Sequence, residues 1–272
     1  KSRERVNWSV KLWDENGEGG ELGHSFFELG LLEVSDWTAK WITGNYKVKN
    51  SERYPVDCFR KGISVTKAVK AARLYITACG LYEARLDGVK IGDFVMAPGH
   101  TDYRKRVQYQ TYDVTEMLTS GKHALTVQLA DGWYRGSIGA WGIRNQYGSE
   151  TKFLAQLEIT YVDGKREDIV TDDSWEWSND GPIRFADNKD GEVYNANREP
   201  SYNSKAKMTS HNVIPTASNN VPVVEKEHFT PTVAKAPNGK WLLDFGQNIA
   251  GYVCFRLQAE KDQRLHFRFG EM

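Results

Sequence analysis

Cysteine and histidine are both scarce, which argues against several kinds of metal and redox site. The chain of 272 residues has three cysteines, far apart and without a Cys-x-x-Cys spacing, so neither a zinc site nor a redox motif is expected. Buried free thiols are the favoured interpretation of Cys58, Cys79 and Cys254. The six histidines are scattered without a His-Glu-x-x-His pattern, so no metal centre of that type is indicated.

Net charge and long apolar runs are missing as well. Lysine plus arginine and aspartate plus glutamate each number 36, so no basic surface for nucleic acid is indicated. No apolar run approaches the roughly 18 residues of a membrane span, and the opening Lys-Ser-Arg-Glu-Arg contains no apolar signal region. We therefore expect neither a nucleic-acid partner nor a membrane partner, and periplasmic, extracellular and cytoplasmic locations all stay open.

Alternating apolar and polar residues fill most of the chain and predict β-strands. Leu125, Val127 and Leu129 alternate with polar neighbours, and a longer alternation runs from Phe153 to Tyr161. Asp87-Gly88 separates two such runs, which predicts a hairpin with a type I′ turn. A helix signal extends for little more than one turn after Asp113. Many short strands and little helix predict an all-β, mostly antiparallel β-sandwich.

The strand pattern divides the chain into three segments. Residues 1–30 contain two predicted strands around a glycine-rich turn, and residues 31–215 contain the strands of the sandwich. Residues 216–272 are expected to form a linker and then the first strands of a second β-sandwich. Serine, asparagine, lysine and threonine dominate from about residue 201 to 221, which predicts a linker or a long surface loop.

Four short motifs occur in an order that points to one family. Residues 37–42 read Trp-Thr-Ala-Lys-Trp-Ile, and residues 131–136 read Asp-Gly-Trp-Tyr-Arg-Gly. Residues 191–199 read Gly-Glu-Val-Tyr-Asn-Ala-Asn-Arg-Glu, and residues 244–251 read Asp-Phe-Gly-Gln-Asn-Ile-Ala-Gly. Together they resemble the segments that precede the catalytic domain in bacterial α-L-rhamnosidases, an inverting glycoside hydrolase family.

The resemblance implies a fold and a function for each segment. Residues 31–215 would form a jelly-roll-like, galactose-binding-like sandwich, and residues 1–30 the last strands of a fibronectin-type-III-like domain. The parent polypeptide would remove terminal α-L-rhamnose from glycans or glycosides. The family's catalytic carboxylates lie on a helical barrel, so we expect no catalytic residue within these 272 residues. The expected role is to support that barrel, with rhamnose-containing glycans as partners. A stand-alone carbohydrate-binding module and a purely architectural β domain are the alternatives.

The third motif departs from the family pattern. The family has Asp and Arg where this chain has Asn195 and Asn197, so a charge-assisted bond between those positions is lost. We expect both asparagines to tie their loop to the neighbouring sheet, and Glu192 to bond backbone N–H groups or Arg198. The structural signature residues are Glu192, Asn195, Asn197, Asp244, Gly246 and Asn248. The aspartates near the third motif, Asp187 and Asp190, are expected to be solvated turn residues.

The stretch from residue 131 to 147 is the candidate sugar site. It combines aromatic rings, planar polar groups and glycines, as sugar sites do. An alternative is that the aromatic residues only plug the end of the sandwich. The candidate carbohydrate-binding residues are Asp131, Trp133, Tyr134, Arg135, Trp141 and Arg144. We expect Trp133 or Trp141 to be exposed in a concavity beside Arg135 or Arg144.

No cofactor is required by these patterns. Some rhamnosidase sandwiches resemble calcium-dependent rhamnose-binding modules, and calcium needs six to eight oxygen ligands. Glu83, Asp131 and Asn145 are the calcium candidates if their loops meet, although no Asp-x-Asp-x-Asp spacing supports them.

The last predicted strands have no predicted partners within the chain. Trp241–Phe245, Tyr252–Leu257 and Leu265–Phe269 alternate in polarity. Unpaired strand edges and apolar faces seek partners, so we expect this segment either to fold back on the first sandwich or to pair with another copy of the chain. Self-association is favoured, because a few unpaired strands bury little surface alone.

Overall fold

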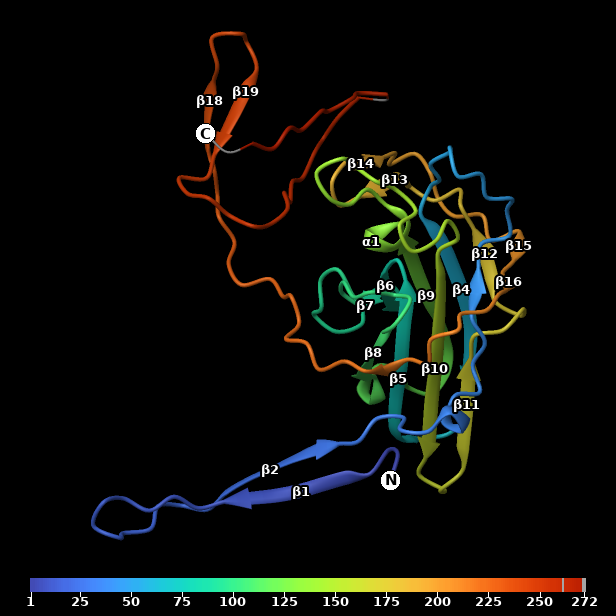
Figure 1. The fold of residues 1–272 in the computed structure, drawn as a ribbon, viewed down its shortest axis with the longest axis vertical. Helices are drawn as coiled ribbons and strands as arrows, with labels where there is room; N and C mark the ends of the chain where they lie inside the picture. Colours follow the sequence, from blue (N-terminus) through green and yellow to red (C-terminus); the bar gives the residue numbers. More distant parts are fainter. Residues whose placement is uncertain (261, 271–272) are drawn as a thin grey trace. The chain divides into compact units, whose positions relative to one another are not determined.

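The computed structural model of the chain describes residues 1–260 and 262–270 and confirms the all-β class. It consists of two units, Lys1–Val224 and Glu225–Met272. A β-sandwich and a projecting hairpin make up the first unit (Figure 1). Within the described residues, helix is limited to two 3-10 turns, η1 (Val34–Asp36) and η2 (Thr115–Met117), and one short helix, α1 (Gly132–Arg135). No helix of the described residues is long and apolar enough to cross a membrane.

Two sheets form the sandwich. The strand order of the first is β16 (Lys207–Met208), β3 (Ile42–Thr43), β10 (Lys152–Tyr161), β5 (Val69–Cys79), β8 (Gln108–Asp113) and β17 (Thr216–Ala217), with β11 (Arg166–Val170) also paired to β10. The order of the second is β15 (Ser204–Lys205), β12 (Glu176–Ser178), β4 (Asp57–Val65), β9 (Gly121–Ala130), β6 (Leu81–Leu86) and β7 (Val89–Lys90). All neighbours are antiparallel except β8 and β17, which are parallel.

The predicted alternation is what builds the core between the sheets. Side chains of a strand point alternately to its two faces, and the apolar sets from β9 and β10 are all buried. Phe59 of β4 meets Phe153 of β10 edge to face at 4.7 Å, and Trp175 packs against the same ring. The turn between β6 and β7 has positive φ at Asp87 (51°) and Gly88 (83°), as a type I′ turn requires. The predicted hairpin is therefore confirmed.

The outer face of the first sheet is covered by the chain just before β3. Trp37 packs its ring edge to face on Tyr109 of β8 at 5.2 Å. The Tyr109 hydroxyl accepts a hydrogen bond from the Leu31 N–H at 2.6 Å, and Gln156 of β10 accepts one from the Thr38 N–H at 2.9 Å. The Trp-Thr-Ala-Lys-Trp-Ile motif thus packs over the outer face of this sheet and leads into β3.

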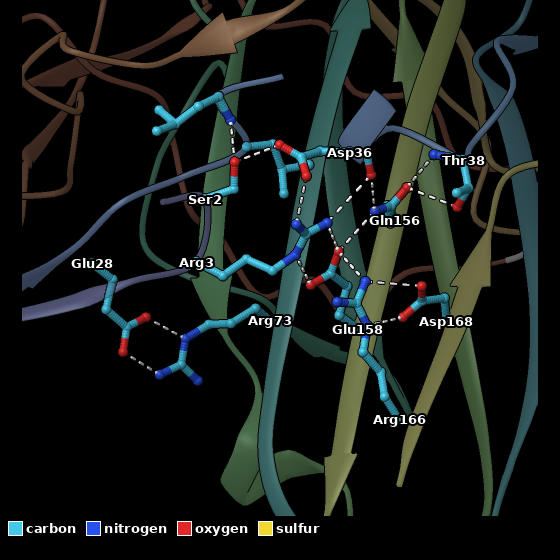
Figure 2. A network of polar contacts seen from close by, with 12 residues as sticks. Ser2, Arg3, Glu28, Asp36, Thr38, Arg73, Gln156, Glu158, Arg166 and Asp168 are labelled. Carbon is cyan, nitrogen blue, oxygen red and sulfur yellow. Dashed lines mark hydrogen bonds and ion pairs between the residues drawn. The ribbon is translucent and has the colours of Figure 1, made fainter. Parts of the chain in front are cut away.

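The hairpin of β1 (Arg5–Val10) and β2 (Gly23–Glu28) is tied to the sandwich at its base (Figure 2). Arg3 donates to Glu158 of β10 through Nε and Nη2, and to Asp36 through Nη1, each at 2.7 Å. Arg73 of β5 donates twice to Glu28, at 2.8 Å each. Paired bonds between a guanidinium and a carboxylate are among the stronger polar contacts in proteins, so the network holds the hairpin to the first sheet.

The segment that was predicted as a linker from residue 201 to 221 instead contributes strands. β15 pairs with β12, β16 with β3, and β17 with β8. Gln108 binds both asparagines that follow β17, donating to Asn219 at 2.8 Å and accepting from Asn220 at 2.6 Å. The first unit accordingly continues to Val224.

The second unit contains one hairpin, β18 (Thr232–Lys235) with β19 (Trp241–Asp244). The strands predicted over Tyr252–Leu257 and Leu265–Phe269 do not form within the described residues. A strand needs a neighbour for its backbone hydrogen bonds, and nothing within the described part of this unit pairs with these two segments. The sequence-based assignment was wrong there because alternation alone does not supply a partner.

Candidate functional site

The Asp-Gly-Trp-Tyr-Arg-Gly motif forms α1 directly after β9. Gly132 has φ of +50°, in the left-handed region that glycine adopts most easily. This conformation turns the chain from β9 into α1, and it leaves the motif's side chains pointing to different surroundings. Asp131, Tyr134 and Arg135 are buried at 3%, 4% and 1% exposure, whereas Trp133 is only half-buried.

Two residues of the motif, Asp131 and Arg135, form a buried ion pair. Arg135 donates from Nε to Asp131 Oδ1 at 2.8 Å, and its Nη2 lies 2.7 Å from the same oxygen. Its Nη1 donates to the Tyr46 hydroxyl at 2.6 Å, and the Tyr54 ring lies 5.3 Å from the guanidinium. Burial raises the pKa of Tyr46, with Asp57 adding to the shift. These contacts join α1 to the loop of residues 45–55.

The 45–55 loop and the 136–148 loop both contact Arg135, and they are hydrogen-bonded to each other. Arg144 Nη2 donates to the Glu52 carbonyl at 3.2 Å, and Asn145 Nδ2 donates to the Asn50 carbonyl at 3.2 Å. Asn145 also returns its N–H to the Arg135 carbonyl at 3.0 Å. The 45–55 loop and the 136–148 loop are thus anchored together over α1.

The turn between β13 (Ile183–Asp187) and β14 (Gly191–Tyr194) holds the start of the 136–148 loop. Asp187 accepts from the Ser137 N–H at 2.7 Å, and Asp190 accepts from the Ser137 hydroxyl at 2.7 Å. Asp187 is buried at 7% exposure. The prediction of a solvated turn residue was wrong for Asp187, because this carboxylate satisfies backbone N–H groups of two segments.

Burial corrects half of the predicted sugar-binding set. Asp131, Tyr134 and Arg135 face the interior, so their role is structural and no sugar surface remains on them. Arg144 is also largely covered, with 15% of its side chain exposed and its Nη2 lying 3.9 Å from Asp131. Trp141 is 88% exposed at the tip of the 136–148 loop.

An aromatic cluster joins Trp133 and Tyr147 of the predicted 131–147 stretch to His100, which the sequence did not indicate. The His100 ring stacks on Trp133 with centroids 5.4 Å apart and planes inclined by 28°. Tyr147 lies beside His100 at 6.1 Å, and Arg104 lies 5.2 Å from the Tyr147 ring. We call His100, Trp133 and Tyr147 the aromatic cluster. No local pattern in the sequence links these three positions, since the fold brings them together from separate loops.

The calcium candidates do not converge. Glu83 on β6 pairs with Arg85 at 2.6 Å, Asp131 is engaged with Arg135, and Asn145 donates to a carbonyl. Among the described residues, no group of three or more histidine, cysteine, aspartate or glutamate side chains is placed to hold a metal ion. Each of the three candidates thus has a protein partner of its own, and calcium binding by them stays a prediction.

The Gly-Glu-x-Tyr motif is held by local contacts. Asn195 Oδ1 accepts from the Asn197 N–H at 3.0 Å, and the Asn195 N–H donates to the Pro182 carbonyl at 2.8 Å. The side-chain amide of Asn195 thus closes its own turn, where a bond to the neighbouring sheet was expected. Glu192 is exposed, and partial desolvation raises its pKa. Its expected bond to Arg198 is not formed, because Arg198 pairs with Asp180.

The fourth motif closes the end of β19. Asp244 Oδ1 accepts from the Gly246 N–H at 2.8 Å, and Gly246 has φ of +72°. Asn248 is exposed in the segment that follows. These contacts are those of a turn that ends a strand.

Solved structures with the same fold are α-L-rhamnosidases. The enzyme from Aspergillus terreus is 34% identical and superposes with a TM-score of 0.83 over 92% of this chain, which corresponds to 31% of that structure. The α-L-rhamnosidase from Dictyoglumus thermophilum is 30% identical, with a TM-score of 0.78 over 91% of this chain and 30% of its own.

Comparison of the sequence agrees. An α-L-rhamnosidase of Formosa agariphila is 34% identical over the whole of this chain, which spans 31% of that relative's length. The model of the α-L-rhamnosidase N-terminal domain matches residues 67–235, and the model of the bacterial α-L-rhamnosidase concanavalin-like domain matches residues 234–272. The chain therefore belongs to the α-L-rhamnosidase family and comprises its N-terminal β-sandwich domain with a segment of its concanavalin-like domain.

Proposed function

We propose that this chain is a non-catalytic part of an α-L-rhamnosidase that removes terminal α-L-rhamnose from glycans, and that it supports the helical catalytic barrel of that enzyme. The observation that carries the proposal is the match to the two family models over residues 67–272, together with the relative that matches the whole chain. The state of the acidic residues near the motifs agrees with it. Asp131 and Asp187 are buried and engaged in structural bonds, whereas an inverting hydrolase needs two carboxyl groups facing one substrate.

We further propose that the aromatic cluster and Trp141 form the glycan-contacting face. Pyranose rings present C–H faces that pack on flat aromatic rings, and nearby polar groups bind the hydroxyls. The half-exposed Trp133 ring is stacked on His100, and Arg104, which pairs with Asp102, lies over the Tyr147 ring of the same cluster. The buried polar pair beneath keeps the supporting loops in place. Without such binding, the alternative of a purely architectural domain would hold.

Titration with L-rhamnose or a rhamnose-containing oligosaccharide should show weak binding that Trp133→Ala lowers by about 5- to 150-fold. The reason is that loss of the ring removes the stacking surface, which is worth about 1–3 kcal/mol by analogy with other aromatic stacking contacts. Isothermal titration calorimetry with and without calcium measures it. Trp241→Ala is the matched control, since Trp241 is 70% exposed in the second unit. If the unmodified chain gives no heat of binding even with calcium present, the sugar-binding proposal fails and the architectural role is left.

The purified chain should not hydrolyse p-nitrophenyl α-L-rhamnoside. The reason is that the family resemblance places the acid and the base on a helical barrel, whereas helix in the described residues is limited to α1 and two 3-10 turns. Release of p-nitrophenol is followed by absorbance against a mock purification. Turnover that survives repurification and is lost with a point change in this chain would overturn the proposal.

A further inference from the structure

One buried carboxylate beneath the two loops has no cation against it. Asp57 is fully buried. Its Oδ1 accepts from Trp177 Nε1 at 2.9 Å, and its Oδ2 accepts from the Thr151 hydroxyl at 3.2 Å and the Tyr46 hydroxyl at 3.3 Å. These donors are all neutral. No ion pair between described residues includes Asp57.

The neighbouring charges are already committed to each other. Asp131 Oδ1 lies 2.7 Å from Arg135 Nη2, and Asp131 Oδ2 lies 3.9 Å from Arg144 Nη2. Arg135 reaches Asp57 only through the Tyr46 hydroxyl, to which it donates at 2.6 Å. The titratable and charged groups around Asp57 are Tyr46, Arg135 and Asp131, and the adjacent Cys58 thiol, whose pKa is raised by burial and by Asp57. Trp177 of β12 and Thr151 before β10 contribute none. A buried charge without a direct partner is unfavourable.

The surroundings of Asp57 suit a protonated carboxyl group as well as an ionised one. The hydroxyls of Thr151 and Tyr46 donate to a carboxylate, and a hydroxyl is also an acceptor with two lone pairs. Rotation of either hydroxyl lets it accept from a protonated Asp57 without loss of the contact. Gly44 adds close packing, because a Cβ there would lie 2.6 Å from Asp57 Oδ1. The site thus excludes water and still satisfies both protonation states.

We propose that Asp57 is a proton-binding site that makes the anchoring of the 45–55 and 136–148 loops stronger in mildly acidic solution than at neutral pH. Tyr46 bonds to Asp57 from the first loop, and it also holds Arg135, whose backbone carbonyl receives the second. Burial raises the pKa of Asp57 to about 6, against about 3.9 for an aspartate in an unfolded chain. Between these pH values the folded site holds a proton that the opened site has lost, so stability falls as pH rises through about 6.

The proposal is tested by amide hydrogen exchange of the two loops at pH 5 and pH 7.5, corrected for the intrinsic exchange rate. With the two pKa values above, opening that exposes Asp57 should be about tenfold more frequent at pH 7.5. Asp57→Asn should abolish this difference, because the amide does not titrate. Asp187→Asn is the matched control: it weakens a clamp on the 136–148 loop without touching Asp57, and the tenfold difference should persist.

A second measurement uses the unmodified chain and does not depend on whether Asp57→Asn folds. Carbon-13 NMR of labelled aspartate carboxyl groups should show a midpoint near 6 for Asp57. A midpoint at or below about 4, or an Asp57→Asn variant that keeps the tenfold pH dependence, would overturn the proposal. No sugar is present in either measurement, so the outcome is independent of glycan binding.

Discussion

Replacing Arg135 by alanine is expected to lower the free energy of unfolding by about 3–5 kcal/mol. The guanidinium is almost fully buried and is held by Asp131 and Tyr46. Its removal leaves the Asp131 carboxylate buried at 3% exposure, with Arg144 at 3.9 Å as its nearest cation. It also takes away the bond to Tyr46, so the 45–55 loop loses its tie to α1. Equilibrium denaturation in urea, followed by tryptophan fluorescence, measures the change.

Two further variants separate the buried charge from a general effect of losing an arginine. Arg104→Ala removes an exposed guanidinium that pairs with Asp102, and surface pairs contribute between 0 and about 1 kcal/mol. A double change of Asp131→Leu with Arg135→Leu removes both buried charges and should recover a large part of the loss. An Arg135→Ala variant no less stable than Arg104→Ala would mean that the buried pair adds nothing to the fold.

Gly132→Ala should cost about 3 kcal/mol in the same denaturation experiment. Two penalties combine. An L-residue with a side chain pays roughly 1–2 kcal/mol in the left-handed region, and φ at Gly132 is +50°. An added Cβ would also lie 2.6 Å from Leu81 Cγ and 3.0 Å from the Leu81 backbone nitrogen. The backbone atom gives way less easily than a side chain, so the clash adds overpacking cost.

Gly139→Ala is the matched control for the conformational part of that cost. Gly139 has φ of +65°, and its added Cβ would meet nothing within 4 Å. Its replacement should therefore cost about 1–2 kcal/mol. The difference between the two variants isolates the packing of α1 against β6. Equal losses would show that the close approach of Gly132 to Leu81 is relieved without cost.

The strands of the sandwich were predictable because one face of each sheet packs into the core, which leaves an alternating apolar pattern in the sequence. Leu125, Val127 and Leu129 carry that information locally, and so does the Asp87-Gly88 turn. The site was less predictable. Asp131 and Arg135 stand four residues apart, a spacing that reads equally well as a solvated pair on a helix surface. Their burial depends on Tyr46, which comes from a distant loop, and nothing local in the sequence specifies that meeting.

Polar composition misled the prediction at the end of the first unit. Thr216 and Ala217 lie in a stretch that resembles a loop, yet their backbone completes an edge of the first sheet. An edge strand of two residues needs hydrogen-bond partners but no apolar side chains, so it leaves no pattern. The second unit shows the reverse case. Tyr252–Leu257 has the alternation of a strand without a partner, and no strand forms among its described residues.

The edge strands of the first sheet come from distant parts of the chain, and this affects how the domain folds during synthesis. β3 comes from near the beginning of the chain, while β16 and β17, on opposite sides of the sheet, come from near its end. During synthesis the β3 side of this sheet stays open until residue 208 has left the ribosome, and the β8 side until residue 217 has. Non-local pairing of this kind is slow to form, and open strand edges on a nascent chain invite wrong pairing. A translation pause that keeps residues 204–217 inside the ribosome should therefore favour aggregation, and one that comes after they have emerged should not.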